Sequence, residues 1–162
     1  MKRYVILILL MGLLIGCETN NETSNSNETV ISEAVLKYLA FDEYLEVGSS
    51  IDYYHLTMSS VPGLPLDFKV LKDEAEYTIE ISVSAGKLLS WKDSIVEPLG
   101  DTVFMEYKDF TIYWSPLDDV IIENADLLIE VKQDDDTIAK AAYQMALSDK
   151  GYVLMQIVLT DE

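Results

Sequence analysis

The sequence predicts a mostly-β domain in which two antiparallel sheets pack as a sandwich. Several segments alternate apolar and polar residues with a period of two, the pattern of a strand with one buried and one solvated face. Turn-forming residues separate such segments, as in the stretch from Val61 to Pro65. With 162 residues, the chain is long enough for one domain of ordinary size.

We expect the domain to begin with a helix over residues 30–47, where Thr29 can cap and apolar residues recur at helical spacing. Residues 50–59 are rich in Tyr and other strand-forming types, and turn chemistry follows at residues 61–65. Residues 76–84 give the clearest strand pattern, because they alternate over their whole length. Four side chains share the predicted buried face: Tyr77, Ile79, Ile81 and Val83.

The second half of the chain contains further strand patterns. Residues 102–114 predict a hairpin, which would place Phe104 opposite Tyr113 on the face away from the core. Residues 125–132 alternate again, and residues 152–160 predict a final apolar strand.

Residues 137–148 fit either a helix or a strand. Four Ala, a cap at Asp136 and a stop at Gly151 favour a helix, whereas the surrounding strands favour a strand. The segment Ser148-Asp149-Lys150-Gly151-Tyr152 resembles the Asp-x-Gly turn before a Tyr-bearing strand in immunoglobulin-like sandwiches. We therefore expect an immunoglobulin-like sandwich with one N-terminal helix. The alternative is an α+β domain with a helix at about 137–148.

The N-terminus is organised like an export signal. Lys2 and Arg3 precede an apolar run from Val5 to Ile15, which is shorter than the roughly 20 residues that span a bilayer. The run ends in Leu14-Ile15-Gly16-Cys17, which resembles the lipobox of bacterial lipoproteins. The resemblance implies that residues 1–16 are a signal peptide, and that acylated Cys17 anchors the protein on the extracytoplasmic side of the cell membrane.

Residues 17–29 are expected to be the lipidated Cys and a disordered tether, because residues 18–29 contain no apolar side chain. As a flexible coil, this tether spans about 19 Å. A single globular domain would then occupy residues 30–162. The sequence leaves open whether the membrane is the inner or the outer one in a host with two membranes.

The charge of the chain restricts its partners. The net charge is −18, and residues 17–162 alone hold nine Lys, no Arg and 29 acids, a net charge of −20. Nucleic acids are excluded as partners, because their binding requires a basic face. Arg supplies the bidentate donors that recognise phosphate, and residues 17–162 contain no Arg, which disfavours phosphate-bearing partners. Cationic partners are favoured, and the alternative explanation of the acidity is solubility.

Few residues are suited to catalysis or metal binding. A Ser-His-Asp triad would depend on His55, the only His, and no Gly-x-Ser-x-Gly sequence accompanies it. The cluster Asp134, Asp135 and Asp136 offers oxygen ligands of the kind that Ca²⁺ prefers, but it lacks the EF-hand spacing. A charged turn is the alternative. We expect no cofactor, and whether these acids bind calcium stays open.

Pro116-Leu117-Asp118 and Glu130-Val131-Lys132 together resemble the proline–acid and acid-x-lysine pattern of a large nuclease fold. The resemblance implies Mg²⁺ bound by Glu130 and by Asp118 or Asp119, with Lys132 orienting the attacking water. An alternating strand equally explains Glu130 and Lys132 as outward side chains, and a surface of charge −20 repels DNA.

Three aromatic side chains are candidates for a binding platform: Trp91, Phe104 and Tyr113. Aromatic residues act as anchors for sugar rings and protein partners. Our leading hypothesis is a non-enzymatic lipoprotein that binds a protein, peptide or saccharide at the cell envelope. The alternative is an acidic inhibitor or immunity lipoprotein that captures a cationic enzyme or toxin, and a metal-dependent nuclease is a remote third. Neither the ligand nor the oligomeric state follows from the sequence.

Overall fold

A computed structural model describes residues 40–58, 60–72, 76–116 and 121–157 of the chain. These residues belong to one compact unit, Ile31–Glu162. The predicted signal peptide, Cys17, the expected tether and the first ten residues of the predicted helix lie outside the described residues.

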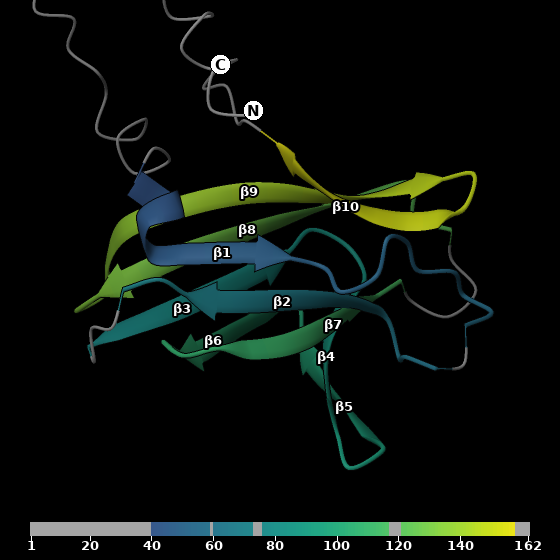
Figure 1. Ribbon diagram of the computed structural model, residues 1–162, viewed down its shortest axis with the longest axis horizontal. Coiled ribbons are helices and arrows are strands. Elements are labelled where there is room, and N and C mark those ends of the chain that lie inside the picture. Colours follow the sequence, from purple (N-terminus) through teal and green to yellow (C-terminus); the bar gives the residue numbers. More distant parts are fainter. Residues whose placement is uncertain (1–39, 59, 73–75, 117–120, 158–162) are drawn as a thin grey trace, which may run out of the picture. The chain divides into compact units, whose positions relative to one another are not determined.

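Ten strands in the described residues form two antiparallel sheets of five strands (Figure 1). Sheet A contains, in spatial order, β1 (Leu45–Gly48), β2 (Leu64–Val70), β7 (Phe110–Ser115), β4 (Lys87–Lys92) and β5 (Ile95–Gly100). Sheet B contains β10 (Gly151–Ile157), β9 (Asp136–Ser148), β8 (Asn124–Gln133), β3 (Tyr77–Val83) and β6 (Thr102–Glu106). The predicted mostly-β antiparallel sandwich, with one short helix, is confirmed.

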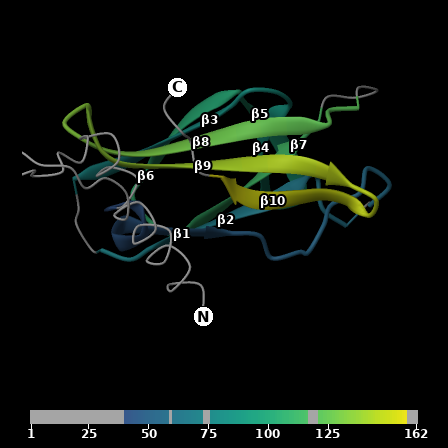
Figure 2. The same ribbon diagram turned by 90° about the horizontal axis from the view of Figure 1, so that it is seen from above.

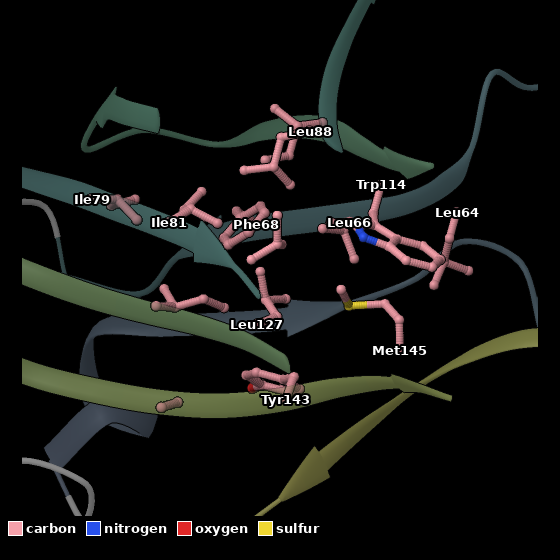
Figure 3. Packing of buried hydrophobic residues seen from close by; sticks show 14 of the residues in the cluster. Leu64, Leu66, Phe68, Ile79, Ile81, Leu88, Trp114, Leu127, Tyr143 and Met145 are labelled. Carbon is pink, nitrogen blue, oxygen red and sulfur yellow. The ribbon is translucent and has the colours of Figure 1, made fainter. Parts of the chain in front are cut away.

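The core lies between the inner faces of the two sheets (Figure 3). Ile79 and Ile81 of β3 are fully buried, as are Leu127 and Ile129 of β8, which pairs with β3. Sheet A contributes Leu64, Leu66, Phe68, Leu88, Ile112 and Trp114. No polar or charged residue among the described residues is buried. The Trp114 indole therefore hydrogen-bonds to main chain, donating from Nε1 to the Ala85 carbonyl at 2.8 Å.

The segment at residues 137–148 is strand β9, and the alternative of a helix there is wrong. β9 lies between β8 and β10, so its backbone is hydrogen-bonded on both sides (Figure 2). Ala139, Ala141 and Met145 are buried against the core. The helix preference of a few Ala residues is worth tenths of a kcal/mol each, which two ladders and this burial outweigh.

The predicted helix at residues 30–47 is wrong at its C-terminal end. Residues 40–44 are helical, and β1 begins at Leu45. Leu45 is buried and pairs with Val70 of β2, so cross-strand pairing replaces the helical pattern. Residues 50–59 hold no strand where they are described, but Tyr54 forms an isolated bridge to Tyr152 of β10.

The predicted hairpin at residues 102–114 is also wrong, because its two strands belong to opposite sheets. β6 pairs with β3 in sheet B, and β7 pairs with β2 and β4 in sheet A. The link between them crosses from one sheet to the other. The Tyr107 hydroxyl donates to the Tyr44 carbonyl at 2.8 Å, and Asp109 Oδ1 accepts from the Val70 N–H at 2.8 Å. In both strands the apolar residues point toward the core. The same alternating pattern is therefore compatible with a hairpin within one sheet and with two strands in opposite sheets.

Candidate binding face

Trp91 and Tyr113, two of the three predicted platform residues, meet on the outer face of sheet A. Their ring centroids lie 5.6 Å apart with an interplanar angle of 76°, an edge-to-face contact. They come from neighbouring strands, because Leu89 of β4 pairs with Tyr113 of β7. Trp91 retains 39% of its surface in water, whereas Trp114, the other Trp, is fully buried.

Four cross-paired residues extend this contact into a row. Pro65 pairs with Tyr113, Tyr113 with Leu89, and Leu89 with Pro98, so that the row crosses β2, β7, β4 and β5. Two residues further along β4, Trp91 pairs with Val96 of β5. We call these outward-facing residues the apolar ladder: Pro65, Leu89, Trp91, Val96, Pro98 and Tyr113. Pro65 is buried at one end of the ladder, and Val96 and Pro98 are exposed at the other.

The exposure of the ladder follows from the β4–β5 hairpin. Asp93 and Ser94 form a two-residue turn with φ values of 53° and 66°, the left-handed pair that matches strand twist. The pairing of β4 with β7 ends at Leu89, so the hairpin continues beyond the rest of sheet A. Figure 1 shows β5 extending away from the two sheets. The Trp91 ring is therefore carried on a projecting hairpin that leaves it accessible.

Phe104, the third predicted platform residue, lies apart from the other two. It belongs to β6 on the outer face of sheet B, where it pairs with Glu80, and it is 66% exposed. The prediction that Phe104 shares a face with Tyr113 is wrong, because it assumed the hairpin. Leu89, Val96 and Pro98 were missed by the sequence analysis. The sequence feature that could have indicated them is the two-residue turn at Asp93-Ser94, because it fixes the register that pairs Val96 with Trp91.

An acidic groove of about 480 Å³ lies on the same outer face, over β1, β2 and the start of β7. Glu46, Asp67 and Asp109 supply three carboxylates to its lining, and Lys69 supplies one ammonium group. Gly48, opposite Asp67, leaves the groove open, since a Cβ there would meet no atom within 4 Å. Two further lining residues, Phe68 and Phe110, are stacked at 4.5 Å between centroids.

Two of the three carboxylates of the acidic groove are held in place by hydrogen bonds. Asp67 Oδ1 accepts from the Thr111 hydroxyl at 2.7 Å, and Asp109 is bound to the Val70 N–H as described above. Glu46 and Lys69 form an exposed ion pair of 3.5 Å, which is worth little in water. The groove therefore keeps a surplus of negative charge.

The groove and the ladder are adjacent. Asp67 is two residues from Pro65 on β2, and Thr111 is two residues from Tyr113 on β7, so all four lie on one face. Burial raises the pKa of the Tyr113 hydroxyl above its usual value, and the negative charge of Asp67 raises it further. The strand register, together with this influence of Asp67 on Tyr113, indicates that the acidic groove and the aromatic pair adjoin.

The candidate calcium ligands form a turn. Asp134 and Asp135 have φ values of 48° and 72° and connect β8 to β9, whereas Asp136 is the first residue of β9. Asp tolerates this left-handed conformation better than most residues. Within the described residues, no three acidic, His or Cys side chains are grouped as a metal site requires.

Glu130 and Lys132 of the nuclease-like pattern lie on the outer face of sheet B. Lys132 Nζ contacts the Glu80 carboxylate and lies 3.8 Å from Glu130 Oε2. The hydrogen bond to Glu80 is the main cause that raises the pKa of Lys132. Asp118 and Asp119 lie outside the described residues. His55 is exposed, with its Nδ1 2.8 Å from the Thr57 hydroxyl.

Comparisons with known proteins assign no family to the chain. No family model, curated protein or solved structure matches the chain. None of the helical residues that the structure describes form a helix long and apolar enough to cross a membrane.

Proposed function

We propose that the protein is a non-enzymatic binding module of the cell envelope, which holds its partner on the apolar ladder. The observation that carries the proposal is the edge-to-face contact between the exposed Trp91 and the half-buried Tyr113. Trp and Tyr are the residue types most often found as energetic anchors in interfaces. A strand pair that keeps such residues in water, beside a groove rich in carboxylates, has the composition of a recognition surface.

The location of this module at the envelope is supported by the sequence. The lipobox-like Leu14-Ile15-Gly16-Cys17 follows a basic start and an apolar run, and a polar tether follows Cys17. Acylation of Cys17 would hold the domain on the extracytoplasmic side of the membrane, with a tether that spans about 19 Å. The cell membrane is therefore the first partner that we propose, through the lipid.

The binding proposal is tested with the full-length chain, purified in detergent from its host. Immobilised protein is titrated with three probes: a soluble wall glycan, a neutral apolar peptide and a basic apolar peptide. Trp91→Ala is the test variant, and Phe104→Ala is the matched control, because it removes an exposed aromatic ring from the other sheet. We expect Trp91→Ala to weaken the binding of at least one probe tenfold or more, and Phe104→Ala to leave it unchanged. Equal affinity of both variants for every probe would overturn the proposal.

The lipid anchor has a separate test. The wild-type chain and a Cys17→Ser variant are expressed in a bacterium fed with labelled palmitate. We expect the label and membrane retention in the wild type alone. A Cys17→Ser product that is still processed, labelled and membrane-bound would refute the anchor without bearing on the ladder.

A second candidate function is an acidic inhibitor or immunity lipoprotein that captures a cationic enzyme or toxin. The acidic groove favours it, because carboxylates steer a basic protein toward the surface and speed its association. The two functions differ in their response to salt. Affinity that falls steeply between 50 and 300 mM NaCl supports the inhibitor, and affinity that is insensitive to salt supports binding through the ladder alone.

A further inference from the structure

We propose that the partner of this face is an extended basic polypeptide segment, with apolar side chains on the ladder and a Lys or Arg side chain in the acidic groove. This inference rests on the proposed function and names its partner class. Three carboxylates against one Lys give the groove a charge complementary to a cation. A neutral saccharide would leave those carboxylates without a counter-charge.

The spacing of the strands determines which segments fit. Neighbouring strands in a sheet lie about 4.8 Å apart, and Asp67 on β2 is separated from Trp91 on β4 by two such steps. The groove and the Trp91 ring are therefore roughly 10 Å apart across the sheet. In an extended peptide, residues two and four positions apart are about 7 and 13 Å apart and point to the same side. Even spacing between the basic and the apolar residue fits the face, and odd spacing does not.

The groove is ready to accept the cation. The carboxylates of Asp67 and Asp109 are already fixed by the Thr111 hydroxyl and the Val70 N–H, so that little side-chain freedom is lost on binding. Each of these bonds uses Oδ1 of its carboxylate, and an Asp carboxylate has lone pairs for further donors. A Lys or Arg side chain that enters the groove would add charge-assisted hydrogen bonds to them.

The ladder supplies the apolar half of the recognition. Its exposed end projects with the β4–β5 hairpin, and Val96 is 46% exposed beside Trp91. Pro98 makes strand addition at the free edge of β5 unfavourable, because it has no N–H to donate to an incoming strand. Recognition through side chains lying across the strands is therefore favoured over extension of sheet A.

Fluorescein-labelled peptides of nine residues test the inference by anisotropy with the full-length chain. One peptide places Lys and Leu four positions apart in a Ser/Thr background, a second places them three apart, and a third replaces Lys with Glu. We expect the first to bind at least fivefold more tightly than the second and tenfold more tightly than the third. Trp91→Ala should weaken the first peptide by tenfold or more.

Charge variants separate the groove from the general acidity of the protein. Asp67→Asn and Asp109→Asn keep an oxygen that can accept the same hydrogen bonds while removing the charge. Asp149→Asn is the matched control, because it lies in the β9–β10 turn of the other sheet. We expect the double variant Asp67→Asn/Asp109→Asn to lose about tenfold in affinity for the Lys peptide and to show a shallower salt dependence. Asp149→Asn should bind like the wild type.

The outcomes distinguish this inference from the proposed function. If a wall glycan binds in a Trp91-dependent manner and the Lys peptide does not bind, the polypeptide partner is refuted and the binding module stands. If the groove variants and Asp149→Asn behave alike, the groove does not recognise the cation, and the inference is likewise refuted. If Trp91→Ala changes the binding of no probe, the proposed function fails as well.

Discussion

Raising the pH above 10 is expected to destabilise the fold through Tyr143. This side chain is only 6% exposed. Burial, with a smaller contribution from the negative charge of Asp42, raises the pKa of its hydroxyl to about 12, compared with about 10 in an unfolded chain. Between these values the unfolded chain has lost the proton that the folded chain keeps. Stability that is fully present below pH 10 is therefore lost as the pH rises toward 12.

The size of this loss follows from the difference between the two pKa values. One pKa unit corresponds to about 1.4 kcal/mol, so the full difference is worth roughly 2.7 kcal/mol, of which about half has been lost at pH 11. Urea unfolding of the wild type and of Tyr143→Phe, followed by the fluorescence of Trp91 and Trp114, measures it at pH 8 and at pH 11. The wild type should lose about 1.4 kcal/mol more than the variant over this range.

Tyr53→Phe is the matched control, because Tyr53 is 41% exposed. Its loss of stability over the same pH range should equal that of the wild type. An equal alkaline loss in the wild type and in Tyr143→Phe would show that the Tyr143 hydroxyl is not held in its neutral form by the fold.

Three further substitutions test separate parts of the structure by urea unfolding. Gly151→Ala should cost about 3 kcal/mol, because its φ is +132° and the new Cβ would lie 2.4 Å from the Tyr54 carbonyl oxygen. Asp135→Gly should stabilise the protein by about 0.5 kcal/mol, because Gly adopts the φ of 72° without strain. Lys132→Met should destabilise it by about 1 kcal/mol at pH 7 and less at pH 4, since it leaves Glu80 facing another carboxylate across the strands.

Each of these predictions has an outcome that would contradict it. Gly48→Ala, which meets no atom within 4 Å, is the control for Gly151→Ala, and equal effects would refute the role of the close approach. A loss of calcium-dependent stability in Asp135→Gly would show a metal site in place of a plain turn. A Lys132→Met variant whose loss is the same at pH 4 and pH 7 would show that charge repulsion is not its cause.

The strands that the sequence predicts best are those with uninterrupted alternation. Residues 76–84 and 125–132 correspond to β3 and β8, with Ile81 and Ile129 on the buried face as predicted. Period-two alternation determines which side chains face the core, whatever the partner strand is. β2 was missed because Pro65, the second residue of that strand, and the turn-forming residues before it suggest a loop.

Pairing partners could not be predicted, and this limited the candidate site. The pattern at residues 102–114 is satisfied equally by a hairpin and by a crossing between sheets, because in both arrangements the apolar residues point inward. Phe104 was therefore placed with Tyr113, although it lies on the other sheet. Trp91 and Tyr113 meet only because β4 is the neighbour of β7 in sheet A. These two strands are not consecutive in the sequence, so no local pattern indicates that they pair.

The crossing between β6 and β7 has a consequence for how the chain acquires its fold. Because β3 and β6 lie in sheet B whereas β2 and β7 lie in sheet A, Ile81 in β3 pairs with Ile129 in β8, and Leu66 in β2 with Ile112 in β7, about fifty positions apart in each case. Strand pairings over such sequence separations are typical of domains that fold in milliseconds to seconds. Until β8 and β9 have been synthesised, the layer opposite sheet A consists of β3 and β6 alone, without the buried residues of the two central strands. The domain is therefore expected to fold only after its C-terminal strands are available, rather than progressively from its N-terminus.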